Sequence, residues 1–266
     1  MKYHIGNILI IFIICIITLY CIYYNFYNIK KEGFDTTKYS TNIPIVVICW
    51  NNYYFVKHFI NQIKKYKNPI ILLDNNSSYN KLLEYYKIIK NELKDRIEIR
   101  LLKENYGHKV YQKLKDELPK IYILSDPDLE LNKNMPINFA DILLELSNKY
   151  KSNKVGCALS IEDNDLFIKC DKYIAGHNIY EWEIQFWDKR IKNNDYELYY
   201  ADTDTTFCLI NNNYSSSKNN IRIAGDFTVK HLPWYDNYIK NNLSENELNV
   251  WKSLNKSSTI LKCLNL

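Results

Sequence analysis

Between residues 43 and 128, short apolar stretches alternate with stretches whose apolar residues recur every three or four positions. The first pattern is typical of strands buried on both faces, and the second of helices with one buried face. We predict strands at 43–49, 70–73, 97–102 and 121–124. We predict helices at 55–63, 82–89 and 108–118, with Ser78 as a possible N-cap of the second. Strands that alternate with helices in this way form a parallel sheet through right-handed crossovers, so the fold class is α/β with helices on both faces.

The rest of the chain continues this pattern less regularly. Helical spacing returns at 138–150, and 155–159 is a further predicted strand. Residues 211–220 are rich in Asn and Ser without an apolar period, which is typical of a surface loop. Ser244 and Glu247 have the spacing of a capping box, so we expect a last helix to begin there.

The amino end has a different pattern. Residues 5–24 contain no charged side chain, and about 20 apolar residues are enough to span a bilayer as a helix. We predict a transmembrane anchor at 1–27, a polar linker at 28–42 and a single α/β domain at 43–266. The alternative is a cleaved signal peptide, but the residues after the apolar core are bulky and offer no small-x-small cleavage site. The positive charges on the two sides of the span nearly balance, so they do not decide its orientation.

Composition adds three limits. With 47% hydrophobic and 24% charged residues in 266, the chain can bury a core and is not disordered. The net charge of +5 comes without a dense basic block, so no nucleic-acid partner is expected. The seven cysteines show no paired spacing, which favours free buried thiols over a disulfide framework or a zinc site.

Polar residues follow each of the four predicted strands. In open α/β sheets the ligand binds at the carboxyl ends of the strands, so these residues are expected to meet in one site. They are Trp50, Asn51 and Asn52 after the first strand, Asp74 after the second, Asn105 and His108 after the third, and Asp126 and Asp128 after the fourth. Each of them alone is also an ordinary turn or cap residue.

Asp126 and Asp128 carry the most specific chemistry. Pro127 fixes the backbone between them, so two carboxylates stand in a stiff turn just beyond a buried strand. Carboxylate oxygens are the ligands that divalent cations such as Mg²⁺ prefer, and such a cation can bridge the phosphates of a nucleotide. The alternative is a solvated turn without a ligand.

Together with three later segments, these residues resemble the family 2-like glycosyltransferases, which have the GT-A fold. In that family the first strand ends in a polar turn at the nucleotide, the second in an Asp at the base or ribose, and the fourth in an Asp-x-Asp metal motif. The resemblance covers about residues 43–236. A subgroup shares three segments in the same order, which are here Trp182-Glu183-Ile184-Gln185-Phe186-Trp187, Asp204-Thr205-Thr206-Phe207 and His231-Leu232-Pro233-Trp234-Tyr235.

The resemblance implies a role for each residue that matches a motif. His231 would complete the shell of a Mn²⁺ or Mg²⁺ ion held by Asp126 and Asp128. Asp204 would be the base that deprotonates the acceptor, with Asp202 in reserve. The donor site would be formed by Trp50, Asn51, Asp74, Asn105, His108, Asp126 and Asp128.

The expected activity is metal-dependent transfer of a hexose or N-acetylhexosamine from a UDP-sugar to a hydroxyl group of a glycan or protein, with inversion. One alternative is a nucleotidyltransferase, although the Gly-rich phosphate loop of that class is missing after the first strand. Another is a non-catalytic membrane-anchored scaffold or glycan-binding protein. Glycosylation sequons at Asn75 and Asn76 would place glycans beside the site, which favours a single-pass protein with its domain on the cytosolic side.

Overall fold

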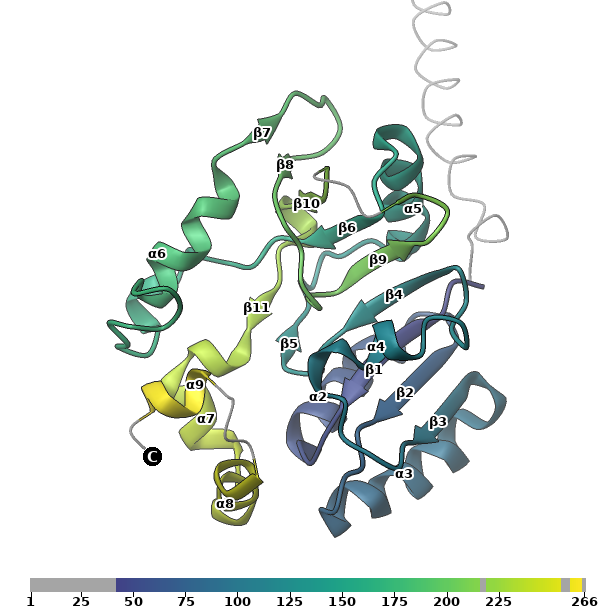
Figure 1. The fold of residues 1–266 in the computed structure, drawn as a ribbon, viewed down its shortest axis with the longest axis vertical. Coiled ribbons are helices and arrows are strands. Elements are labelled where there is room, and N and C mark those ends of the chain that lie inside the picture. Colours follow the sequence, from purple (N-terminus) through teal and green to yellow (C-terminus); the bar gives the residue numbers. More distant parts are fainter. Residues whose placement is uncertain (1–41, 216–218, 255–258, 265–266) are drawn as a thin grey trace, which may run out of the picture. The chain divides into compact units, whose positions relative to one another are not determined.

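The computed structural model describes residues 42–215, 219–254 and 259–264, which form a large sheet with helices on both faces (Figure 1). The described residues fall into one compact unit. Within them, no helix has the length and apolar character needed to cross a membrane. The predicted anchor at 1–27 and nearly all of the predicted linker lie outside the described residues.

The described residues contain a main sheet of nine strands in the order β3-β2-β1-β4-β9-β6-β10-β8-β7. β1 to β4 pair in parallel, whereas β9 runs against both β4 and β6, and β8 runs against β10 and β7. β5 (Leu129–Glu130) and β11 (Lys230–His231) form a separate antiparallel ribbon. The main-sheet strands are β1 (Ile45–Cys49), β2 (Ile70–Asp74), β3 (Ile97–Leu101), β4 (Ile121–Ser125), β6 (Lys154–Cys157), β7 (Arg190–Ile191), β8 (Leu198–Tyr200), β9 (Cys208–Asn211) and β10 (Ile221–Ile223). The predicted α/β sheet is therefore confirmed, with a mixed half that the sequence pattern did not indicate.

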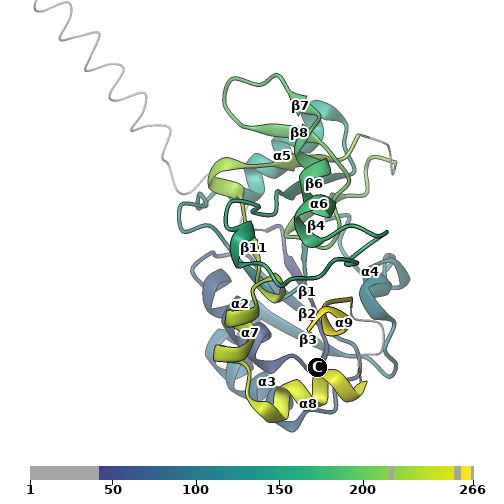
Figure 2. The ribbon, with the colours of Figure 1, turned by 90° about the vertical axis from the view of Figure 1, so that its left-hand side faces the viewer.

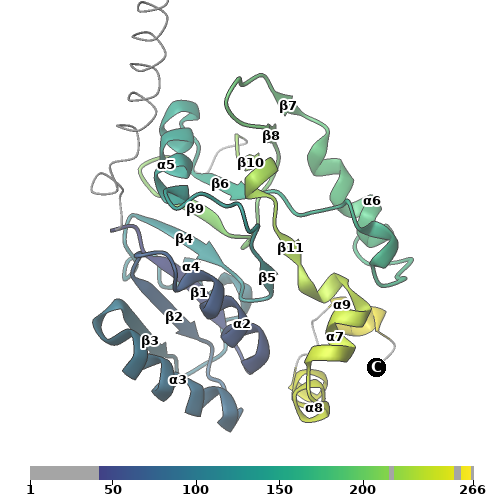
Figure 3. The same cartoon turned by 180° about the vertical axis from the view of Figure 1, so that it is seen from behind.

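The continuous apolar run of β1 follows from its position in the middle of the sheet. Ile45 and Val47 belong to the core under α2 (Tyr53–Ile63), α3 (Asn80–Leu93) and α5 (Phe139–Tyr150). Val46 and Ile48 belong to the smaller core under α4 (Val110–Lys113) on the opposite face. α4 lies nearer the viewer in Figure 1, and α2 and α3 in the reverse view of Figure 3. Because both faces are covered, every residue of this strand is apolar.

The carboxyl ends of β1 and β2 point toward the last helices of the chain (Figures 1 and 2). These helices are α7 (Asp236–Asn242), α8 (Glu245–Leu254) and α9 (Thr259–Cys263), and α6 (Ile179–Ile184) precedes them in the sequence. The predicted last helix begins one residue after Ser244, whose Oγ accepts a hydrogen bond from the Glu247 amide at 3.3 Å.

Three of the predictions made from the sequence are wrong, two of them about helices. The helix expected at 108–118 is one short 3₁₀ turn, Gly107–Lys109, followed by the four residues of α4. It is short because few of its residues face the core, namely Val110, Tyr111 and Leu118. The N-cap position of α3 is Tyr79, and Ser78 lies just before it.

The third wrong prediction concerns the cysteines. Cys170 and Cys263 form a disulfide between residues 93 positions apart, with their Cα atoms 5.2 Å from each other. Spacing could not indicate this pair, because only the tertiary fold brings α9 beside residue 170. Cys49, Cys157 and Cys208 are free buried thiols, as predicted.

Candidate functional site

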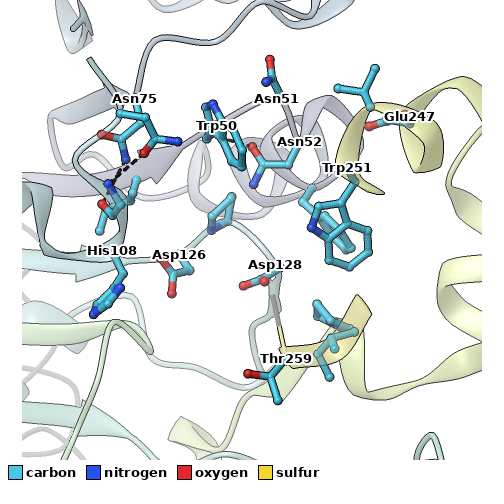
Figure 4. Close-up of a pocket in the computed structure, with 18 of the residues that line it drawn as sticks. Trp50, Asn51, Asn52, Asn75, His108, Asp126, Asp128, Glu247, Trp251 and Thr259 are labelled. Atoms are coloured by element: carbon cyan, nitrogen blue, oxygen red, sulfur yellow. Dashed lines mark hydrogen bonds between the residues drawn. The ribbon is translucent and has the colours of Figure 1, made fainter. Parts of the chain in front are cut away.

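A cavity of about 870 Å³ opens at the carboxyl ends of β1 and β4 (Figure 4). Its walls come from the turns after β1, β2, β3 and β4, from β11 and from the C-terminal helices. Its size and its place at this edge of the sheet are typical of a small-molecule site. The predicted residues that line it are Trp50, Asn51, Asn52, Asn105, His108, Asp126, Asp128 and His231. The structure thus brings together residues that lie up to 181 positions apart (231 − 50).

Asp126 lies just after the carboxyl end of β4 and is hydrogen-bonded to the segment before β9. Its amide donates to the Thr205 carbonyl at 2.7 Å, and the Thr205 hydroxyl donates to Asp126 Oδ2. Burial raises the pKa of the Asp126 carboxyl well above its usual range, and the charges of Asp128 and Asp204 raise it further, while the Thr205 hydrogen bond lowers it. Negative charge is therefore crowded here, and a bound cation would relieve the repulsion.

The β5–β11 ribbon places His231 beside Asp128. His231 is paired with Leu129 in this ribbon, and the Leu232 amide donates to the Asp128 carbonyl at 2.9 Å. His231 Nε2 lies 3.5 Å from Asp128 Oδ2. Asp128 Oδ1 and His231 Nδ1 are buried and have no hydrogen-bond partner among the described residues. Buried polar atoms of this kind normally have a partner, which a ligand bound in the cavity would supply.

The carboxylates of Asp126 and Asp128 and the imidazole of His231 are groups of the types that bind divalent cations. Within residues 42–215, 219–254 and 259–264, no group of three or more His, Cys, Asp or Glu side chains is arranged to hold a metal by itself. Mg²⁺ in nucleotide sites is usually held by one or two carboxylates, water and the phosphates of the substrate, so a complete protein cage is not required. Asp126, Asp128 and His231 would supply the protein ligands.

The turn after β1 has a structural role as well as a place in the cavity. Asn51 has a φ of 55°, and its Oδ1 accepts hydrogen bonds from the Ser78 and Tyr79 amides, each at 2.8 Å. This side chain therefore joins the β1 turn to the start of α3. Trp50 lines the cavity, and its amide donates to Asn52 Oδ1 at 3.1 Å.

The structure does not bring Asp74 to the cavity. Its side chain is 1% exposed, Oδ1 accepts from the Ser77 amide at 2.7 Å, and Oδ2 accepts from the Tyr86 hydroxyl at 2.6 Å. Both oxygens are used inside the fold, so neither is free to contact a base or ribose in this structure. Asn75 lines the cavity in its place, where its Nδ2 donates to the Gly107 carbonyl at 3.1 Å.

The loop after β3 forms the side of the cavity opposite α8. Asn105 Oδ1 accepts from the Gly107 amide at 2.8 Å, and Gly107 has a φ of 66°, where glycine is favoured. His108 is exposed at the rim. Among the described lining residues, His108 and His231 are the only basic side chains, with no Lys or Arg. A phosphate ligand would therefore depend on a cation for most of its charge balance.

The two proposed acceptor-side carboxylates lie outside the cavity lining. The Asp204 side chain is exposed, and its negative charge raises the pKa of the Asp126 carboxyl. Asp202 is exposed as well, and its Oδ1 accepts from Asn220 Nδ2 at 3.4 Å. Asp204 is therefore next to the candidate metal site, and Asp202 is tied to the loop before β10.

The Trp182–Trp187 segment forms a buried structural contact. Glu183 on α6 pairs with Arg222 on β10, and their side chains are 2% and 5% exposed. The Arg222 guanidinium also lies 4.1 Å from the centre of the Phe186 ring, and its Nε donates to the Asp202 carbonyl at 2.8 Å. This contact connects α6 to the segment that carries Asp204.

The sequence did not indicate the contribution of the C-terminal helices. Leu243, Glu247, Val250, Trp251, Thr259 and Ile260 line the cavity. The spacing at 244–254 predicted a helix but gave no sign of what it covers. Trp251 would have been a candidate ligand-binding residue if the position of this helix beside the cavity had been known.

No protein-family model and no curated protein matches this chain. Among solved structures, it is similar to the mannosyltransferase PcManGT from Pyrobaculum calidifontis in complex with GDP-Man and Mn²⁺, with 14% identity and a TM-score of 0.37 over 48% of this chain and 39% of that one. It is also similar to GalNAc-T7 with UDP, GalNAc and Mn²⁺, with 11% identity and a TM-score of 0.49 over 75% of this chain and 47% of that one. The chain spans less than half the length of either protein. Likenesses this distant carry no argument about activity, so function has to be argued from the site itself.

Proposed function

We propose that the protein is a metal-dependent glycosyltransferase that moves a hexose or an N-acetylhexosamine from a nucleotide diphosphate to a hydroxyl acceptor. The observation that carries the proposal is that Asp126, Asp128 and His231 meet in one cavity whose described lining has no Lys or Arg. A diphosphate needs a divalent cation to bind beside these carboxylates, and Mn²⁺ and Mg²⁺ suit such ligands. UDP is the nucleotide we expect, and the anchor at 1–27 stays a prediction.

The chemistry divides between the cavity and the surface beside it. When bound, the cation neutralises charge on the diphosphate leaving group. Asp204 is our candidate base, and its exposed carboxylate faces an acceptor that arrives from outside the cavity. It takes the hydroxyl proton as the acceptor oxygen bonds to the anomeric carbon. The bond from that carbon to the diphosphate oxygen breaks with its electron pair leaving on the nucleotide, which inverts the anomeric configuration.

Titration of the purified full-length protein with UDP and GDP, with and without Mn²⁺, tests the proposal. We expect binding of one nucleotide that requires the cation. A panel of nucleotide sugars should then release the free nucleoside diphosphate, whereas a nucleotidyltransferase would release pyrophosphate and a glycan-binding scaffold would release neither. No cation-dependent binding of any nucleotide would contradict the proposal.

We expect Asp204→Asn to lower transfer by about 100-fold or more, because the acceptor proton loses its base. Binding of UDP with Mn²⁺ should stay within about twofold, since the Asp204 side chain does not line the cavity. Steady-state rates and calorimetric titration measure the two effects. Asp202→Asn is the matched control and should keep most of the activity. If Asp202→Asn instead lost all transfer activity while Asp204→Asn stayed active, Asp202 and not Asp204 would be the base.

We expect Trp251→Ala to weaken binding of the nucleotide sugar by about tenfold, because stacking on an aromatic ring is worth about 1–3 kcal/mol. Trp251 is half-buried in the cavity wall, with its ring 6.3 Å from that of Phe55. Trp187 is also half-buried but packs on Tyr199 outside the cavity, so Trp187→Ala is the control. If the Trp251 variant and the wild type bound the nucleotide sugar with equal affinity, Trp251 would not be part of the binding site.

A further inference from the structure

The C-terminal wall of the cavity consists of Leu243, Glu247, Val250, Trp251, Thr259 and Ile260. It follows the last sheet strand in sequence and covers the ends of β1 and β4, so it can be released without unpairing the sheet. Its attachment to the rest of the domain decides whether this side of the cavity is formed.

A polar contact attaches the wall to the domain at α8. Glu247 is 4% exposed, and its Oε1 accepts a hydrogen bond from the Tyr54 amide at 2.5 Å. This amide belongs to the first turn of α2, which has no intrahelical partner for it. The contact therefore satisfies an otherwise unpaired donor and fixes α8 over the turn after β1.

The second attachment is the Cys170–Cys263 disulfide at α9. α9 has only five residues, too few for a helix to be stable alone, and three of them are buried. The bond joins α9 to the segment that carries Tyr173, which also lines the cavity. That segment is fixed in turn, because the Ile168 amide donates to the Trp234 carbonyl at 2.7 Å and Trp234 Nε1 donates to the Tyr173 hydroxyl at 3.2 Å.

Both ends of the disulfide therefore lie next to residues of the cavity. Cys263 follows Ile260 by three residues, and Cys170 precedes Tyr173 by three. Trp234, which holds Tyr173, packs with its ring 4.9 Å from the His231 ring. The covalent bond thus connects the C-terminal wall to the side of the cavity that carries the candidate metal ligand.

We infer that the Cys170–Cys263 disulfide completes the nucleotide cavity, so that the protein binds its nucleoside diphosphate ligand tightly only when this pair of thiols is oxidised. Reduction by a dithiol breaks the sulfur–sulfur bond, leaves a thiol on each cysteine and oxidises the dithiol to its own disulfide. α9 then loses its covalent attachment, and Thr259 and Ile260 leave the wall. The inference rests on the proposed function for the identity of the ligand.

The same bond bears on the compartment. Disulfides persist in oxidising compartments and are rare in the cytosol. A domain whose binding site depends on one would work on the extracytosolic side of the membrane, opposite to the cytosolic side favoured by the sequons. The Asn75 amide is 1% exposed and hydrogen-bonded to Gly107, so the folded domain leaves it no room for a glycan, whereas the Asn76 side chain is exposed.

The test compares the oxidised full-length protein, the same protein after treatment with dithiothreitol, and the Cys170→Ser/Cys263→Ser variant. UDP and GDP binding is titrated with Mg²⁺ present, and amide hydrogen exchange is followed by mass spectrometry. We expect reduction and the double substitution each to weaken nucleotide binding by about tenfold or more, through loss of preorganisation. Dithiothreitol should not change the variant, which excludes an effect of the reductant on the metal.

Hydrogen exchange separates opening of the wall from general unfolding. We expect faster exchange in residues 167–174, in α8 and in α9, with β1 and β4 unchanged. Equal nucleotide affinity in the oxidised and reduced protein would overturn the inference. Faster exchange through the whole sheet would overturn it as well, since the bond would then be a general stability element. If the oxidised protein binds no nucleotide, the proposed function fails, and the exchange pattern still decides whether the disulfide fastens the wall.

Discussion

Asp128→Ala is expected to lower cation-dependent nucleotide binding by about 100-fold or more, because it removes one of the two carboxylates of the candidate metal site, the one 3.5 Å from His231. The fold should tolerate the change. The β5–β11 ribbon uses the Asp128 backbone carbonyl, which remains in the variant, and the side-chain contact that is lost is the one between Asp128 Oδ2 and His231 Nε2, 3.5 Å apart. Removing the Asp128 charge also reduces the electrostatic repulsion on the Asp126 carboxylate, since the Asp128 charge raises the pKa of Asp126.

The measurement is a calorimetric titration of UDP or GDP with Mn²⁺, together with electron paramagnetic resonance of the free Mn²⁺ ion. Asp128→Asn keeps the shape of the side chain without its charge, and it should fall between the wild type and the Ala variant. Asp95→Ala, at an exposed position near the opposite ends of the strands, is the charge control and should bind normally. If Asp128→Ala bound the nucleotide and Mn²⁺ like the wild type, Asp126 and His231 would lose their assignment as metal ligands too.

The parts of the site that the sequence predicted well are those that follow buried strands. β1 and β4 are continuous apolar runs because helices cover both of their faces. The ends of these runs could therefore be located in the sequence, and so could Trp50 and Asp126, which follow them. The rule that ligands bind at the carboxyl ends of strands then placed these residues in one site. His231 was found through its motif, although the ribbon that brings it to Asp128 is only two residues long in each strand.

The residues that the sequence did not predict depend on long-range contacts. Asp74 has the same local pattern as a ligand-binding Asp, but the Tyr86 hydroxyl and the Ser77 amide use its oxygens. Glu247 was predicted to cap its own helix, yet its carboxylate reaches the Tyr54 amide, 193 positions away. No period or spacing carries such information, because the partner is chosen by tertiary packing alone.

Arg222→Met is expected to destabilise the fold by about 3–5 kcal/mol at pH 8, because it leaves the buried Glu183 carboxylate without its partner. Burial raises the pKa of Glu183 to about 7, although the Arg222 charge, the Arg222 hydrogen bond and the His231 charge all lower it. A carboxyl whose folded pKa is raised contributes stability that is present below its unfolded pKa, near 4.5, and is lost as the pH rises through the folded pKa. Without Arg222 the folded pKa rises further, so the variant loses more stability than the wild type above pH 7.

The cost of the substitution should therefore shrink as the pH falls from 8 to 5, since Glu183 then takes up a proton and no unpaired charge remains. The cost that persists at pH 5 comes from the hydrogen bond between Arg222 Nε and the Asp202 carbonyl and from the packing of the guanidinium on Phe186. Urea unfolding followed by circular dichroism at both pH values measures this difference. The double variant Glu183→Gln/Arg222→Met removes both charges and is expected to recover much of the stability at pH 8 and to lose the pH dependence. An equal cost at pH 5 and pH 8 would mean that packing on Phe186, and not the charge of Glu183, makes Arg222 necessary.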